Sequence, residues 1–236
     1  MSDWKPQRFW KIAKATPCEG GFTVLLDDRG VKTPAKASLT VPTLSMAEAI
    51  AAEWDAQVDV VDPASMPVTK GANAAIDKVS IQRAEVVAML ADYGDSDLLC
   101  YRAAGPDALI ARQAEHWDPL LVWASDTLGA QLKVGEGVMH VAQEADALAR
   151  LHAHVDAFDN FGLAAVHDLI SISGSLILAL AVTQDAITPE VAWAASRVDE
   201  HWQVEQWGED DEATAFEVVK RDAFLDAVRF FRLSQN

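Results

Sequence analysis

The stretch from residue 198 to residue 212 holds the densest group of side chains that could do chemistry. Seven of its fifteen residues are carboxylates, two are tryptophans, and none is Lys or Arg. Paired carboxylates can act as general acid and base or bind a divalent cation. On a helix, Glu205 and Glu209 would share one face, as would Asp199 and Gln203. One hypothesis is therefore a metal-dependent hydrolase built on the acidic cluster 199–212.

The same residues also fit a binding surface. Carboxylates are almost never fully buried unless they are paired, so this cluster is expected at the surface. Trp202 and Trp207 would point about 140° apart on one helix, so they cannot both face the same core layer. Exposed Trp framed by charge is typical of an interface hot spot. We predict no catalytic residue and a partner-binding segment comprising Asp199, Glu200, Trp202, Gln203, Glu205, Trp207, Gly208, Glu209 and Asp210.

No other motif in the chain indicates a catalytic, metal or cofactor site. His152 and His154 are two residues apart, so on a helix they point about 200° away from each other and cannot share a metal ion. Ser173-Gly174-Ser175 lacks the Gly-x-Ser-x-Gly frame of a nucleophile elbow. The glycine patterns of phosphate and dinucleotide loops are absent as well. The sequence thus predicts neither a cofactor nor a metal.

The charge of the chain is uneven. Its 236 residues carry a net charge of −17. Residues 1–36 hold seven Lys/Arg and four Asp/Glu, a balance of +3, whereas the remainder holds twelve and thirty-two, a balance of −20. An anionic surface of this kind repels nucleic acid and anionic lipid headgroups but can attract a basic protein patch. Nucleic-acid and membrane partners are therefore not expected.

Compartment and membrane signals are few. The two cysteines, Cys18 and Cys100, are far apart in the sequence, which fits a reducing compartment better than a disulfide framework. The N-terminal residues resemble neither a secretory signal nor a transit peptide, so we expect a cytoplasmic protein. The longest apolar stretch, Leu163–Thr183, contains His167 and Asp168. We interpret it as one buried helix rather than a membrane span.

The N-terminal part is predicted to be rich in β-structure. Glycine and aspartate turns separate four β-prone segments, which predicts a small antiparallel meander of 8–16, 22–27, 31–33 and 39–41. A helix should follow, started by a capping box of Ser45 and Glu48, with Met46 and Ile50 on its apolar face. The Pro-containing residues 59–70 are the predicted boundary. We therefore expect an α+β protein with a β-rich domain at 1–70 and a helical domain at 71–236.

Helix-start and helix-stop residues organise the second region. Pro106 and Pro119 are predicted in first turns, and Gly129 should end the helix that follows. Thr188-Pro189-Glu190 predicts a further helix start, and Gly208 the corresponding end. This assignment places most of the acidic segment on a helix.

Several blocks of the sequence resemble the Atp12 family, the assembly chaperones of the F1 sector of ATP synthase. They occur in the family's order over about residues 8–212. The N-terminal blocks are Arg8-Phe9-Trp10-Lys11, Leu26-Asp27-Asp28-Arg29, Thr33-Pro34 and Glu53-Trp54-Asp55-Ala56-Gln57. The later blocks are Asp97-Leu98-Leu99-Cys100-Tyr101-Arg102, Trp117-Asp118-Pro119, Gly174-Ser175-Leu176 and the acidic Trp segment, Asp199–Asp210.

The resemblance implies a non-enzymatic chaperone that binds the unassembled F1 α subunit and covers the surface that β later occupies. It also implies a small β-rich domain followed by a larger helical one, occurring in the cytoplasm of α-proteobacteria and in the mitochondrial matrix of eukaryotes. A monomer is expected, because one client subunit has to be covered. The β-rich domain, around Arg8–Lys11, remains an alternative location for the client site.

Overall fold

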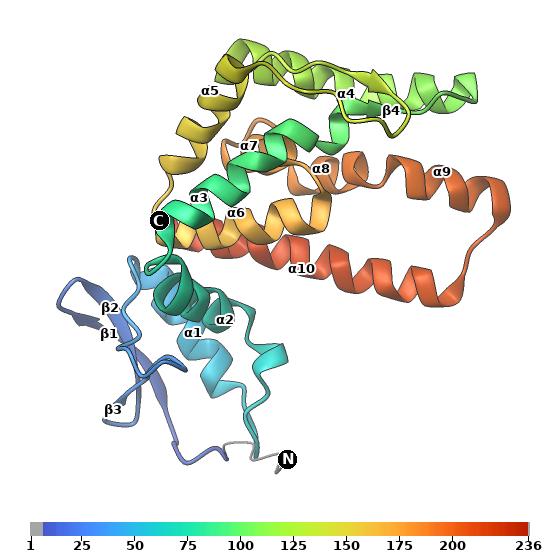
Figure 1. The fold of residues 1–236 in the computed structure, drawn as a ribbon. Coiled ribbons are helices and arrows are strands. Elements are labelled where there is room, and N and C mark those ends of the chain that lie inside the picture. The colour runs from blue at the N-terminus through green and yellow to red at the C-terminus, as the bar shows by residue number, and fades with distance from the viewer. Residues whose placement is uncertain (1–6, 236) are drawn as a thin grey trace. The chain divides into compact units, whose positions relative to one another are not determined.

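The computed structural model describes residues 7–235, which form two compact units (Figure 1). The first unit contains the described residues up to 83, residues 160–165 and the chain from 229 onwards, and the second contains 84–159 and 166–228. Helices α6 (Asn160–Ser173) and α10 (Asp211–Gln235) supply residues to both units. A small antiparallel sheet precedes a larger helical region, which confirms the predicted α+β class.

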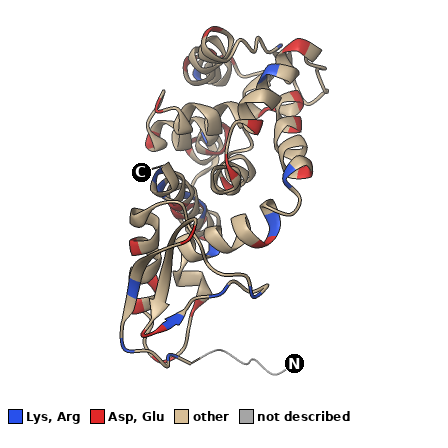
Figure 2. Ribbon diagram, turned by 90° about the vertical axis from the view of Figure 1, so that its left-hand side faces the viewer, with Lys and Arg blue, Asp and Glu red and all other residues tan. Residues whose placement is uncertain are grey.

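The sheet of the first unit contains β1 (Ala13–Cys18), β2 (Gly21–Leu26) and β3 (Arg29–Gly30), all antiparallel. A Cβ on Gly21 would lie 2.3 Å from the carbonyl oxygen of Val41, so only glycine permits this approach. The predicted segments 31–33 and 39–41 contribute isolated bridges instead of full strands. Basic residues recur along this sheet (Figure 2).

Helix α1 (Leu44–Asp55) packs on β1 and β2. Met46 and Ile50 are fully buried, as their four-residue spacing predicts. The predicted capping box of Ser45 and Glu48 is wrong, because the helix already begins at Leu44. The cap is Thr43, whose hydroxyl accepts from the Met46 amide at 3.1 Å.

Three short helical segments complete this part of the chain: η1 (Pro63–Ser65), α2 (Pro67–Ala74) and the π-helix η2 (Ala75–Val79). The buried carboxylate of Glu53 on α1 accepts hydrogen bonds from the backbone N–H groups of Val68 and Thr69, at 2.7 and 2.8 Å. It satisfies two amides that the first turn of α2 leaves free, and so fixes α2 against α1.

The second unit is built from helices and two very short strands. Its elements are α3 (Arg83–Ala91), η3 (Asp92–Ser96), η4 (Leu98–Cys100), β4 (Tyr101–Arg102), α4 (Asp107–Leu128), β5 (Gly135–Glu136), α5 (Ala145–Asp156), α6, α7 (Leu176–Thr183), α8 (Pro189–Ser196), α9 (Val198–Trp207) and α10. Strands β4 and β5 pair in parallel. No helix within residues 7–235 is both long and apolar enough to cross a membrane.

The predicted single helix over Leu163–Thr183 is wrong, because Gly174 divides it into α6 and α7. Gly174 has a φ of +74°, a conformation that favours glycine and ends α6. The hydroxyl of Ser175 then caps α7 by accepting from the Leu178 amide at 3.0 Å. All residues from Leu176 to Val182 are buried, so α7 lies at the centre of the second unit.

Helix α4 also differs from its predicted form. Gly129 ends it as expected, with a φ of +66°. Pro119, however, lies inside the helix and not in a first turn. The helix begins twelve residues earlier, at Asp107, after Pro106. The continuous α4 thereby places Arg112 and Gln113 on one long helix that packs against α9.

Candidate functional site

Most of the predicted binding segment forms α9. Thr188 caps α8 and Pro189 opens it, as predicted, and the chain then bends at Arg197, which separates α8 from α9. Gly208, at a φ of +91°, ends α9. Glu209 therefore lies beyond the helix, and the prediction that it shares a helix face with Glu205 is wrong.

One side of α9 is held by α4. Gln113 on α4 is buried and donates to the carboxylate of Asp199 at 2.6 Å, while its own side-chain oxygen accepts from the Ala103 amide at 2.8 Å. Gln113 thus bridges α9 and the strand β4 that precedes α4. This connection assigns Asp199 a role inside the protein.

Arg112 makes the second connection between the two helices. Its guanidinium forms two hydrogen bonds to the carboxylate of Glu205, at 2.7 and 2.8 Å, and lies 4.9 Å from the ring of Trp202. These bonds raise the pKa of Arg112 and lower the pKa of Glu205. A two-bond contact of this kind fixes orientation better than a single charge pair does. Glu205 and Trp202 therefore position α9 against α4.

The opposite side of α9 faces solvent. Trp207 is 80% exposed, whereas Trp202 is half-buried, so the two tryptophans point apart as their spacing predicts. Gln203 is exposed on the same outward side. Glu200 is exposed too, although Arg197 holds it in an ion pair at 2.8 Å. Trp207 is the one large apolar side chain of α9 that is available to a partner.

The tip between α9 and α10 carries four consecutive acids, here called the tip carboxylates: Glu209, Asp210, Asp211 and Glu212. All four are exposed. Asp210 accepts from the Ala213 amide at 2.8 Å and so caps α10. Among residues 7–235, no Lys or Arg forms an ion pair with the other three. Their charge is therefore directed to solvent.

Helix α10 supplies residues that the sequence-based prediction missed. Phe216, Val218 and Val219 are 59%, 55% and 63% exposed. Glu217, between them, bonds to His201 of α9 at 2.8 Å, which joins the two helices into a hairpin, the α9–α10 hairpin (Figure 1). The run of apolar residues directly after the tip carboxylates was a signal in the sequence, but it is also typical of a core-facing helix.

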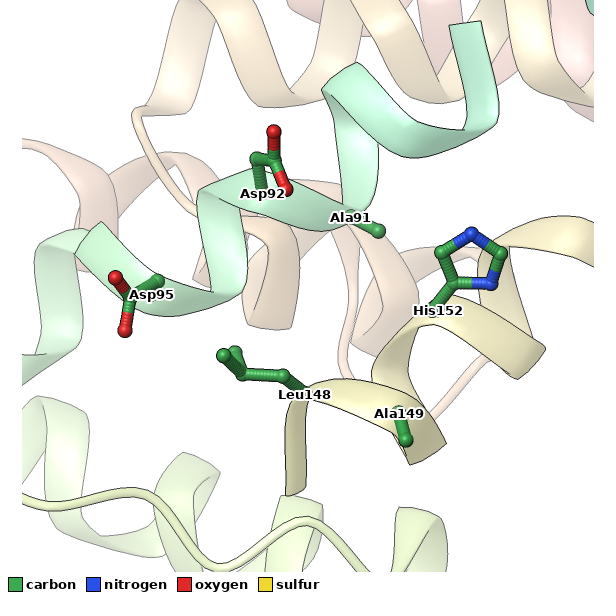
Figure 3. A pocket seen from close by; sticks show the side chains of 6 residues that line it. All are labelled: Ala91, Asp92, Asp95, Leu148, Ala149 and His152. Carbon is green, nitrogen blue, oxygen red and sulfur yellow. The ribbon is translucent and has the colours of Figure 1, made fainter. Parts of the chain in front are cut away.

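A second candidate is a small hollow between η3 and α5 (Figure 3). It has a volume of about 250 Å³ and is lined by Ala91, Asp92, Asp95, Leu148, Ala149 and His152. The labelled polar groups do not converge on one point (Figure 3). Asp95 is already engaged, because the Gln143 amide bonds to its carboxylate at 2.9 Å and lowers its pKa. The hollow therefore has the weaker claim to be the functional site.

The arrangement gives no support to the hydrolase hypothesis. Among residues 7–235, no three His, Cys, Asp or Glu side chains form a group that could hold a metal ion. The carboxylates of segment 199–212 instead divide between helix packing and an exposed tip. A surface for protein contact fits this division better than a reaction centre does.

Comparison with known proteins agrees with a protein-contact role. Residues 7–125 match a family model described as ATP12 chaperone protein. The structure is similar to that of Atp12 from Paracoccus denitrificans, with a TM-score of 0.95 and 48% identity over 99% of this chain and 100% of that one. A structure from Agrobacterium tumefaciens gives 0.93 and 42%, covering 98% of this chain and 87% of that one. Mitochondrial atp12 of Schizosaccharomyces pombe is 25% identical over 88% of this chain and 75% of its own.

Proposed function

Because this chain belongs to the ATP12 chaperone family, we propose that it binds the unassembled α subunit of the F1 sector of ATP synthase. Bound in this way, it covers the surface that faces β and prevents aggregation until F1 assembles. It acts as a monomer in the bacterial cytoplasm and catalyses no reaction.

The observation that carries this proposal is the exposed Trp207 next to the tip carboxylates. An α subunit without β displays a wide apolar surface, and such surfaces aggregate. A Trp side chain supplies a large contact area at small entropic cost, and its burial is favourable at roughly 25 cal/mol per Å². Peripheral carboxylates speed the encounter with a basic patch but add little to the final affinity. This combination suits a partner that has to be covered and later released.

Isolated α subunit, diluted from denaturant, provides the test. We expect the protein to reduce light scattering and to form a complex in a pull-down, while the Trp207→Ala variant loses about a factor of ten in affinity. Met139, 78% exposed on a loop of the same unit, supplies the matched control, because Met139→Ala removes a similar exposed side chain elsewhere. If the wild-type protein neither bound nor protected α, the proposed function would be wrong. Equal loss in both variants would reject Trp207 as the contact.

A further inference from the structure

We propose that the outer part of α10, residues 213–219, belongs to the surface that binds the partner. Together with Trp207, it binds a segment of the partner that is both apolar and basic. The inference rests on the proposed function and extends its binding surface to residues outside segment 199–210. It is carried by exposure, helix geometry and charge.

The outer part of α10 has almost no packing partner within its unit. Every residue from Asp211 to Val219 is exposed except Glu217, which is intermediate. The contacts that hold it are local: the Asp210 cap, the His201–Glu217 bond and Lys220 at 4.7 Å from the ring of Phe216. The helix reaches the core only at Phe224, which is fully buried and 5.9 Å from the ring of Trp193.

The exposed apolar residues share one face of this part of the helix. Phe216 and Val219 are three residues apart, so they lie side by side on the helix surface. The Glu217 side chain points towards α9. Around the helix, Val219 lies about 200° from Glu217 and Phe216 about 100° from it, so both apolar side chains are turned away from Glu217. A solvated helix normally carries polar residues on such a face. An exposed Phe and Val there, on the helix that follows the exposed Trp207 across the tip, mark a surface that a partner covers.

Charge restricts what the partner can be. Residues 198–219 hold eight Asp/Glu and no Lys or Arg. Glu205 and Glu200 are neutralised by Arg112 and Arg197, but Glu209, Asp211 and Glu212 have no such cation among residues 7–235. A partner segment with Lys or Arg beside apolar side chains would match both features of the hairpin.

The same charges argue against the other occupants of an apolar helix face. In a symmetric dimer through this surface, the tip carboxylates of one copy would meet those of the other, and like charges at an interface are costly. The net charge of −17 adds to that repulsion. An anionic lipid surface is disfavoured for the same reason. The geometry and charge thus favour a basic, apolar protein segment.

The test measures the affinity of the full-length protein for isolated α subunit, with a double variant, Phe216→Ala with Val219→Ala. Alanine is a better helix former than either residue, so circular dichroism should show α10 retained. We expect a loss of affinity of about tenfold or more. The matched control is Val138→Ala with Met139→Ala, which truncates two residues that are 94% and 78% exposed on a loop; we expect its affinity to be unchanged.

The outcomes separate the two proposals. If wild-type protein binds α and the double variant binds equally well, the assignment of α10 to this surface is rejected while the proposed function stands. If wild-type protein fails to bind α, both fall. Analytical sedimentation of the wild-type protein tests whether this face forms a dimer. Self-association that the double variant abolishes would overturn the assignment of this face to the α subunit. Binding to vesicles rich in phosphatidylserine that depends on Phe216 and Val219 would overturn it as well.

Discussion

Asp97 and the tip carboxylates belong to the same unit. The fold surrounds the carboxylate of Asp97 with hydrogen-bond donors, whereas it leaves the tip carboxylates exposed to solvent. Asp97 is completely buried, and it accepts hydrogen bonds from the Leu99 and Ile177 amides, each at 3.0 Å, and from the Ser175 hydroxyl at 2.8 Å. It therefore caps η4 and α7 at once. The tip carboxylates are exposed, and of these four Asp210 caps α10 by accepting from the Ala213 amide.

This difference separates acids that build the fold from acids that are available to a partner. A buried carboxylate is tolerated only with enough hydrogen-bond donors around it, and Asp97 has them. Exposed acids without cations contribute little to stability and extend their field into solvent. Asp199 and Glu205 form a third group between these two, because they lie near the surface but bond to residues of α4 and hold α9 in place. Substitution of Asp97 should therefore change stability, substitution of Glu205 should change affinity for the partner, and substitution of the tip carboxylates should change the association rate.

The largest effect is expected at Asp97. The variant Asp97→Ala leaves two buried amides and a hydroxyl without their acceptor, which should lower the free energy of unfolding by about 4 kcal/mol. Asp97→Asn keeps one acceptor oxygen and should lose about half as much. Urea unfolding followed by circular dichroism measures both. Asp222→Asn, on an exposed position of α10, is the control and should unfold like the wild type. Equal stability of all variants would show that Asp97 caps neither helix.

The second prediction concerns the pH dependence of this same group. Burial raises the pKa of Asp97 from 3.8 to about 6, although its hydrogen bonds act in the other direction. Between these values the folded protein binds a proton that the unfolded chain has released. The contribution of Asp97 to stability is thus full below about pH 4 and declines as the pH rises to about 6, by at most about 3 kcal/mol.

The variant Asp97→Asn isolates this contribution because its side chain does not titrate. The difference in unfolding free energy between wild type and Asp97→Asn should decrease from pH 4 to pH 6 and stay constant above. If the difference instead stayed constant from pH 4 to pH 6, the carboxylate would be ionised throughout that range, and the hydrogen bonds would outweigh burial.

The sequence was sufficient for features that depend on neighbouring residues. Thr188-Pro189 predicts a helix start from its own capping and backbone preferences, and Gly129 a helix end. The spacing of Trp202 and Trp207 predicts that they point apart, since it depends only on helix period. The α+β class follows from the same local signals, because turn residues separate short β-prone segments before the long helical region.

Features that depend on distant residues could not be predicted. Gly174 breaks an apolar stretch that reads as one helix, and the acid that binds the new cap at Ser175 is Asp97, 78 positions away. Arg112 lies 93 positions from Glu205, so no local pattern indicates that Glu205 contacts another helix of the protein. Phe216 has the pattern of a core residue, and only the unit's tertiary structure shows that no core faces it.

Exchanging the charges of Arg112 on α4 and Glu205 on α9 tests whether Glu205 acts by holding α9 in place. Glu205→Lys places a cation beside Arg112, which should tilt α9 and weaken binding to the α subunit about tenfold. Combining it with Arg112→Glu restores an ion pair of reversed polarity, and we expect most of the affinity to return. The measurement is the affinity of the single and double variants for isolated α. If the double variant bound as weakly as Glu205→Lys, Glu205 would contact the partner directly, and its separation from the tip carboxylates would be wrong.

The smallest effect is expected from neutralising the tip. Glu209→Gln with Glu212→Gln removes two exposed charges that hold no helix in place, so stability should be unchanged. The association rate with α should fall a few-fold at low ionic strength, and the difference should nearly vanish at high salt, because exposed charges are screened beyond about 10 Å at 0.1 M. Stopped-flow mixing measures the rates, with Glu48→Gln on α1 as the control for a lost exposed acid. A loss of affinity that persists at high salt would mean that these carboxylates make buried contacts in the complex. The tip carboxylates would then resemble Asp97, because hydrogen-bond donors would surround them in the complex, although the partner and not the fold would supply those donors.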